Sequence, residues 1–214
     1  MRRKSISTLF AMLGLVVCVT PAYTPAPAGT VVALTGSCSV YARVLERGDG
    51  IEVNDTVDVP ADSNLKLQMA DGTLISVAPE SRLTVASYSV GETGRHTMLV
   101  LTQGLLRALV PPTAGPLTFD VSTPVGLASL RSAAADWFVR AEAGSAQVGV
   151  LTGAVDFASA ATGESVSIPA HWGTRLEAGR SPMMPRMWAQ MEFEAVIRLT
   201  ACCQPKQETA PSGR

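Results

Sequence analysis

The alternation of apolar and polar residues is clearest between Leu117 and Phe157. In Leu117-Thr118-Phe119-Asp120-Val121-Ser122 the odd positions are apolar and the even positions are polar. Successive side chains of a strand point to opposite faces of a sheet, so this period is typical of a strand with one buried face. Thr123-Pro124-Val125-Gly126 interrupts the pattern with a proline and a glycine, and further apolar positions follow from Trp137 onward. The stretch predicts strands and turns, and it contains no cluster of reactive groups.

Short strand-like runs separated by turn residues also fill the chain from Thr30 onward. The strongest hairpin signal is Asp71-Gly72 between two alternating runs, and this pair favours a type I′ turn with positive φ at both central residues. A weak internal repeat with unequal intervals indicates one turn type reused at equivalent corners; its copies are Leu34-Thr35-Gly36, Leu101-Thr102-Gln103-Gly104 and Leu151-Thr152-Gly153. The predicted fold class is all-β, a compact sandwich or short solenoid-like domain of short strands.

The apolar period changes after Pro182. The positions near helical spacing are Met184, Met187, Trp188, Met191, Ala195 and Leu199, and Pro185 suits a first helical turn. One C-terminal amphipathic helix is therefore predicted, which either docks on the sheet domain or presents an adaptable methionine-rich face to a partner or an interface. Residues beyond Gln204 are polar and are predicted to be disordered.

The N-terminal segment is typical of an export signal. Arg2, Arg3 and Lys4 precede an apolar run over Ile6 to Val19, which is shorter than the roughly 20 residues that a membrane span needs. Ala26-Pro27-Ala28 fits a cleavage site, and an earlier cut near Ala22 is the alternative. The sequence thus predicts a signal peptide over residues 1–28, a periplasmic or secreted location and no stable membrane span after cleavage. An uncleaved anchor, or a lipid anchor at Cys18, is the competing interpretation.

Composition limits the partners of the mature chain. Removal of residues 1–28 leaves 186 residues, enough for one domain with a real core, and takes away three basic residues and no acidic one. The formal net charge moves from −1 to −4, which argues against nucleic acid as a partner because phosphate binding needs a basic face. Only 16% of residues are charged, against about 25% in a typical protein, so Ser, Thr, Ala and Gly must form much of the surface.

Three cysteines remain after cleavage, Cys38, Cys202 and Cys203. A disulfide between Cys38 and Cys202 is one interpretation in an oxidising compartment, and free thiols near the terminus are the other. The adjacent pair has no nearby histidine or second cysteine pair, so neither a zinc site nor any other cofactor is predicted.

Several motifs together resemble the FecR domain family. The segment Asp71-Gly72-Thr73-Leu74-Ile75-Ser76-Val77-Ala78-Pro79-Glu80-Ser81-Arg82-Leu83 is similar to that family's "DGS-x-I-x-L-x-P-x-S-x-L" core. The resemblance continues through Leu101–Arg107, Phe119–Pro124 and Val148–Val155, and it covers roughly residues 29–180. It implies a periplasmic all-β domain without catalytic activity. The predicted organisation is a signal peptide over 1–28, a FecR-like domain over 29–180, and a helix with a disordered tail over 181–214.

Two departures from the family pattern limit what the resemblance implies. The family's "R-G-T" is reduced here to Leu130-Arg131-Ser132-Ala133, which keeps only the arginine. FecR regulators carry a cytoplasmic N-terminal region that binds a sigma factor, whereas five residues precede the hydrophobic run here. We therefore do not expect the signalling role of those regulators. Arg131 follows an apolar run, and it is expected to be structural or to shape a contact loop by pairing with Asp136 or Asp120.

The sequence favours binding over catalysis. It contains no nucleophile elbow, zinc-protease motif or phosphate loop, and His96 and His171 are predicted to be surface or edge residues. The first hypothesis is a non-catalytic module that binds an envelope protein through a sheet edge or the C-terminal helix. The alternative is a carbohydrate or cell-wall binding module that uses exposed aromatic residues on one concave face, for which the candidates are Tyr41, Tyr88, Trp137 and Trp172.

Overall fold

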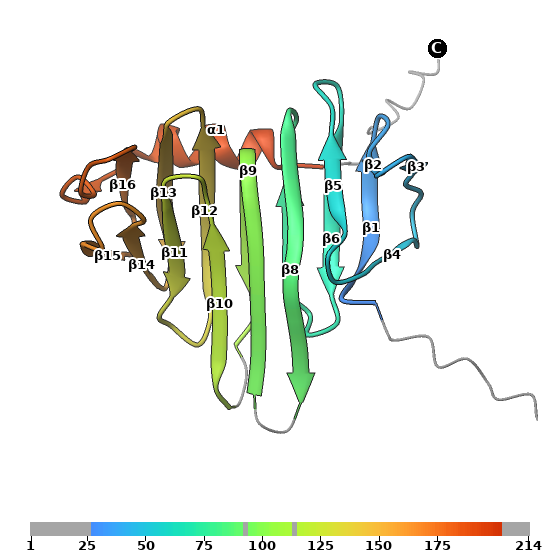
Figure 1. Ribbon diagram of the computed structural model, residues 1–214, viewed down its shortest axis with the longest axis horizontal. Helices are drawn as coiled ribbons and strands as arrows, with labels where there is room; N and C mark the ends of the chain where they lie inside the picture. Colours follow the sequence, from blue (N-terminus) through green and yellow to red (C-terminus); the bar gives the residue numbers. More distant parts are fainter. Residues whose placement is uncertain (1–26, 92–93, 113–114, 203–214) are drawn as a thin grey trace, which may run out of the picture.

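The computed structural model describes residues 27–91, 94–112 and 115–202 (Figure 1). The predicted signal peptide, except for Pro27 and Ala28, lies outside these residues, and so does the predicted disordered tail beyond Gln204. The described residues form seventeen strands and one short helix near the C-terminal end, α1 (Gln190–Leu199). The prediction of an all-β fold with a single C-terminal helix is confirmed.

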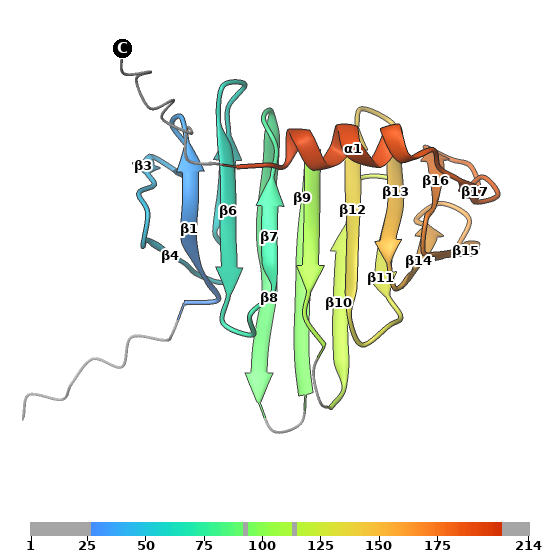
Figure 2. The same ribbon diagram turned by 180° about the vertical axis from the view of Figure 1, so that it is seen from behind.

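The strands form two layers that share the long strand β9 (Gly94–Val110), as the opposite views in Figures 1 and 2 show. Across the first layer the order is β4 (Gly50–Ile51), β1 (Gly29–Thr35), β6 (Asn64–Met69), β7 (Leu74–Val77), β9, β12 (Ala135–Glu142), β13 (Ser145–Thr152), β16 (Trp172–Glu177) and β17 (Arg186–Met187). Across the second layer it is β3 (Arg43–Val44), β2 (Ser39–Val40), β5 (Thr56–Val59), β8 (Ser81–Gly91), β9, β10 (Leu117–Ser122), β11 (Gly126–Leu130), β14 (Ala154–Ser159) and β15 (Ser165–Pro169). The pairing of β9 with β10 is parallel, and the other pairings are antiparallel.

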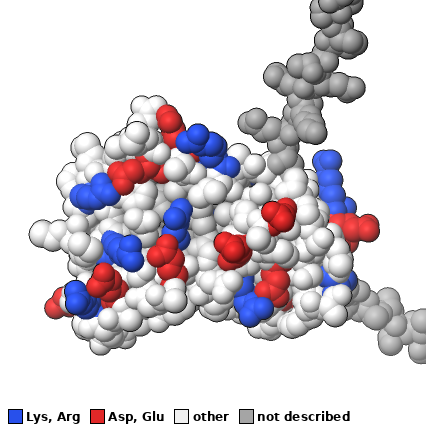
Figure 3. Space-filling view, turned by 90° about the horizontal axis from the view of Figure 1, so that it is seen from above, with Lys and Arg blue, Asp and Glu red and all other residues white. Residues whose placement is uncertain are grey.

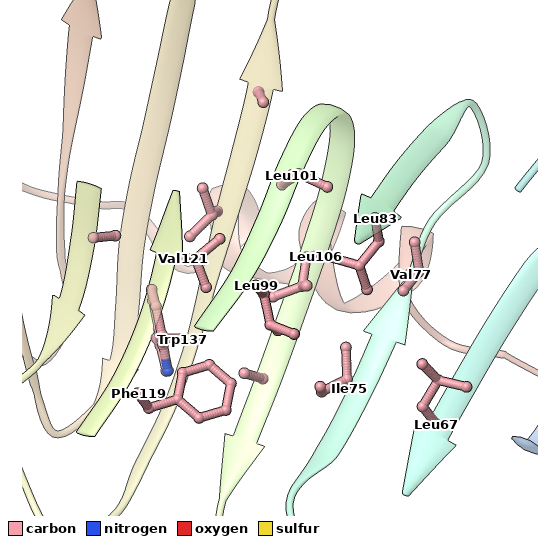
Figure 4. Packing of buried hydrophobic residues seen from close by; sticks show 14 of the residues in the cluster. Leu67, Ile75, Val77, Leu83, Leu99, Leu101, Leu106, Phe119, Val121 and Trp137 are labelled. Atoms are coloured by element: carbon pink, nitrogen blue, oxygen red, sulfur yellow. The ribbon is translucent and has the colours of Figure 1, made fainter. Parts of the chain in front are cut away.

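The main core lies between the two layers (Figure 4). Phe119 of β10 and Trp137 of β12 are both fully buried and meet edge to face, with ring centroids 5.8 Å apart. The two-residue alternation that begins at Leu117 therefore places its apolar positions in this core. Burial of each such side chain contributes about 1.5–3 kcal/mol to stability.

The Asp71-Gly72 hairpin is present, but its turn differs from the predicted one. β6 pairs with β7 in antiparallel register around it. Gly72 has a φ of +86°, whereas Asp71 is not among the residues with positive φ, so the turn is not type I′. The N–H of Met69 donates to the carbonyl of Thr73 and that of Gly72 to the carbonyl of Met69, which is the pattern of a three-residue loop with a glycine bulge.

The three repeated corners have the same local structure. Gly36, Gly104 and Gly153 all have positive φ, and a Cβ at each would overlap the hydroxyl of a serine that packs against it: Ser63, Ser81 and Ser132, respectively. In each corner the residue after the glycine donates its backbone N–H to that serine Oγ, over 3.0, 3.0 and 3.1 Å. The predicted reuse of one turn type therefore corresponds to a repeated glycine–serine contact.

The helix begins later than predicted and buries a different face. Residues 182–189 precede it in an extended path, in which β17 pairs with Trp172 and Gly173 of β16. Pro185 is therefore not in a helical turn, and the side chains of Met184, Met187 and Met191 are exposed. Apolar residues continue at helical spacing before Gln190, but that part of the chain is not helical because β17 pairs with the edge strand β16.

α1 lies across the outer face of the first layer (Figure 2). Trp188, Phe193 and Val196 form a second apolar cluster with Phe138 of β12, together with Ala78 and Leu105. The ring centroid of Phe138 lies 5.2 Å from that of Trp188 and 6.4 Å from that of Phe193. The helix thus docks on the sheet domain. Within the described chain no helix has the length and apolarity that crossing a membrane requires.

Candidate functional site

Arg131 pairs with a different carboxylate from those expected. Its Nε donates to Oδ2 of Asp156 over 2.7 Å, and its side chain is 61% exposed. The expected partners Asp136 and Asp120 were wrong, and the side chain that follows the apolar run lies largely in solvent. Arg131 follows β11, which pairs with β14, and this pairing brings Asp156 close although it is 25 residues away in sequence.

Two less exposed ion pairs were not predicted. Arg107 of β9 donates from Nε and from a terminal nitrogen to the two carboxylate oxygens of Asp136 on β12, over 2.8 and 2.6 Å. Arg95 donates to Oδ2 of Asp71 over 3.0 Å, and the Asp71 side chain is 1% exposed. Both pairs join segments that are distant in sequence, so only the strand order reveals them.

The Asp71 pair belongs to a network that supports the β6–β7 loop. The N–H of Thr73 and its hydroxyl donate to the Asp71 carboxylate, and the backbone N–H of Asp71 donates to the hydroxyl of Tyr88 over 2.8 Å. Burial, with a smaller contribution from the nearby Asp71 charge, raises the pKa of Tyr88 to about 12. This network has a structural role, because the Asp71 carboxylate accepts hydrogen bonds from both Thr73 and Arg95.

The candidate disulfide is not formed in this structure. Cys38 carries a free, buried thiol, and burial raises its pKa to about 11. The Sγ atoms of Cys38 and Cys202 nevertheless lie 3.7 and 3.8 Å from the same acceptor, the main-chain oxygen of Asn64. The fold therefore brings these two residues near each other, but Cys202 is disulfide-bonded while Cys38 is free, so the predicted Cys38–Cys202 disulfide is wrong.

The described residues offer little material for catalysis. The Oγ of Ser87 and Nε2 of His96 lie 2.9 Å apart across the β8–β9 hairpin, but no hydrogen bond or ion pair joins His96 to a carboxylate in the described part of the chain. His171 is exposed. No group of three or more His, Cys, Asp or Glu residues that could hold a metal ion occurs within residues 27–91, 94–112 and 115–202.

The four aromatic candidates do not form a carbohydrate platform. Trp137 is fully buried, and Tyr88 and Trp172 are partly buried against the core. Tyr41, 72% exposed, is the one of the four that offers its ring to solvent, and a sugar-binding platform generally needs more than one such ring. The alternative function therefore has no support from these residues.

Exposed apolar side chains are concentrated on the C-terminal segment. Six of the eleven large hydrophobic side chains that are exposed in the described chain lie between residues 183 and 199: Met183, Met184, Met187, Met191, Ile197 and Leu199. The first four, here called the methionine group, are between 58% and 89% exposed. They lie before and at the start of α1, and the helix docks on the sheet while these methionines stay exposed.

A groove lies beside the other end of α1. Its volume is about 490 Å³, and it is lined by Ala78, Pro79, Glu80, Gln103, Gly104, Leu105, Arg140, Ala141, Glu142 and Leu199. Its lining comes from the β7–β8 turn, the bend of β9 at Gly104, the end of β12 and the last turn of the helix. No pattern in the sequence reveals this site, because its residues come from four separate segments.

Charges are sparse and mixed on the face seen from above (Figure 3). Acidic and basic side chains lie interspersed there, most of that face is uncharged, and no broad basic area is present. Such a face does not provide the positive surface that nucleic-acid binding requires.

The described chain is an all-β protein. Its two most distinct surface features, the methionine group and the groove beside the end of α1, suit binding. Residues 55–156 match the family model described as FecR protein. The resemblance that the sequence motifs indicate is confirmed, over a narrower range than residues 29–180. No curated protein matches the chain in sequence.

The fold is also similar to solved structures. Two crystal structures, at 2.50 and 1.65 Å resolution, show a protein described as a "putative anti-sigma factor" from Parabacteroides distasonis ATCC 8503. Each gives a TM-score of 0.53, with 14% and 15% sequence identity, and covers 65% of this chain. The matched part spans 62% and 63% of the Parabacteroides chain, respectively, and at this identity the similarity concerns the fold alone.

Proposed function

We propose that this protein is a non-catalytic interaction module of the cell envelope that binds a protein partner. The match to the FecR family model supports a regulatory or interaction role, and the Parabacteroides neighbours carry a name that denotes binding to another protein. The described chain combines these similarities with exposed apolar side chains and without a recognisable catalytic arrangement.

The observation that carries the proposal is the methionine group. Large exposed apolar side chains that gather on one segment mark interaction sites in soluble proteins. Methionine suits this role because its unbranched, polarisable side chain can adapt to the shape of a partner. Met184 is 89% exposed and Met191 72% exposed, so neither contributes to the packing of α1 on the sheet.

We further propose export to the periplasm or secretion after cleavage of the N-terminal segment. The support is the sequence pattern of residues 1–28. Ala28 is buried and its carbonyl accepts a hydrogen bond from the N–H of Ala70, so a cut near Ala22 would preserve this contact whereas a cut after Ala28 would remove it. Mass spectrometry of the native protein distinguishes the two sites, and a retained Met1 or a lipid on Cys18 would overturn the export proposal.

The binding proposal is tested by crosslinking in the native envelope. A triple variant, Met184→Ser, Met187→Ser and Met191→Ser, removes exposed side chains that make little contact within the chain, so it should fold normally. We expect the amount of a specific crosslinked protein recovered with this variant to fall about tenfold or more. A tenfold loss of affinity corresponds to about 1.4 kcal/mol of binding free energy. The matched control is Tyr41→Ser with Val44→Ser and Val90→Ser, which removes exposed apolar side chains elsewhere. Equal recovery with both variants would refute the role of the methionine group.

A further inference from the structure

The groove beside the C-terminal end of α1 contains an arginine that has no partner among the described residues. Arg140 lies on β12 two residues after Phe138, so both side chains are on the outer face of the first layer, the face that α1 crosses (Figure 2). Leu105 of β9 lies directly opposite Arg140 in the sheet, and both line the groove. The guanidinium therefore lies beside the helix end and not in the main core.

The pairing state of Arg140 contrasts with that of most other arginines in the described chain. Eight arginines of the described chain form ion pairs with carboxylates, whereas Arg140 forms neither an ion pair nor a hydrogen bond with any described residue. Its Nε is buried and lacks an acceptor. A donor that has lost water without gaining an acceptor is unfavourable, so an anion that enters the groove would relieve this cost.

The rest of the lining restricts which anion can bind. Ala78, Leu105 and Leu199 provide apolar surface. Glu80 and Glu142 also line the groove and would repel a multiply charged anion such as a phosphate, while their oxygens can accept N–H groups. A single carboxylate next to an apolar group, on a chain that carries amide N–H donors, satisfies all of these features.

We propose that this groove binds a peptide segment of the partner protein in which a carboxylate side chain neighbours an apolar one. The carboxylate pairs with Arg140, and the apolar side chain lies against Leu105 and Leu199. A planar guanidinium is suited to bidentate pairing with a carboxylate, which an ammonium group cannot reproduce. The inference rests on the proposed function, because it assigns a second contact to the same protein partner.

The test uses two peptides and the full mature chain labelled with ¹⁵N. One peptide is N-acetylated, C-amidated Ala-Leu-Glu-Ala, and the other has glutamine in place of glutamate. We expect the first to shift the amide signals of Gly104, Leu105 and Ala141, and to bind about tenfold more tightly than the second. In Arg140→Gln the two peptides should bind equally. Arg47→Gln, an exposed arginine without an ion pair in the described chain, removes the same charge elsewhere and should keep the tenfold preference.

Three results with the peptides would overturn the groove proposal: equal binding of both peptides to the unchanged chain, a preference that survives Arg140→Gln, or no shift at the groove with millimolar peptide. The melting temperature of Arg140→Gln should not fall, since the arginine has no described partner to lose, and this separates binding from folding. If the crosslinked partner is lost on substitution of the methionine group but kept with Arg140→Gln, the groove proposal fails and the proposed function stands. Retention of the partner in both variants would refute the groove proposal and the role of the methionine group.

Discussion

The charged side chains show how exposure decides what an ion pair contributes. Arg131 and Asp156 form a short contact, but the arginine is 61% exposed, and water and salt weaken such a pair. Arg107 and Asp136 are 23% and 14% exposed and form two parallel hydrogen bonds. Geometry is favourable in both pairs, so burial should separate their effects on stability.

We therefore expect Arg131→Ala to lower the free energy of unfolding by only about 0.2–1 kcal/mol. Arg107→Ala should cost more, about 1.5–3 kcal/mol, because the less exposed Arg107 loses charge-assisted hydrogen bonds to Asp136. Denaturant unfolding of both variants measures the difference, and Arg131→Lys should recover part of its smaller loss. A larger loss at Arg131 than at Arg107 would contradict this ranking.

The repeated corners explain how short strands are joined into two layers. At Gly104 the strand β9 leaves its pairing with β8 and β10 and continues between β7 and β12. The glycine has a φ of +93°, and Ser81 packs directly against it while accepting the N–H of Leu105. A side chain at this position would separate the two segments that the corner joins.

Gly104→Ala should accordingly destabilise the protein more than an alanine at another glycine with the same backbone conformation. Gly144 is the matched control, because its φ is +75° and no atom lies within 4 Å of the position that a Cβ would take. Gly144→Ala bears only the backbone strain of about 1–2 kcal/mol, whereas Gly104→Ala adds overlap that typically costs about 1–3 kcal/mol. Thermal or denaturant unfolding checks this, and equal losses at both sites would argue against the corner contact.

At the scale of the whole molecule, the helix and the two-layer core are separate apolar clusters. The main cluster lies between the layers, and the residues of α1 contribute only to the cluster on the outer face. Phe138 is fully buried there, under Trp188 and Phe193. The division into residues 29–180 and 181–214 stays a prediction, and the separation of the clusters makes it testable.

A chain that ends at Ser181 should keep a predominantly β circular dichroism spectrum, because the main core does not include α1. Its melting temperature should fall and it should self-associate, since the truncation exposes Phe138 on the outer face of the sheet. Phe138→Thr in the truncated chain should reduce that association, as light scattering or sedimentation would show. Loss of the β spectrum on truncation would mean that the helix is part of the folding core.

Local patterns were sufficient to predict much of this architecture. Two-residue alternation identified the strands and placed Trp137 in the core, the Asp71-Gly72 pair identified a hairpin, and repeated turn residues indicated equivalent corners. These features depend on residues close together in the chain, where periodicity and turn chemistry act directly. The type of turn at Asp71 was missed because a bulge changes the φ values without changing the hairpin signal.

The amino-acid sequence by itself determined the all-β class, the alternating core and the FecR resemblance, because side-chain periodicity and motif order are properties of the linear chain. The tertiary structure alone decided that Arg131 pairs with Asp156, that α1 begins at Gln190, and that Arg140 lies in a groove without a partner among the described residues. Each of these depends on which distant strands become neighbours and in which register. Strand order and register arise from packing across the whole molecule, so no short stretch of sequence specifies them.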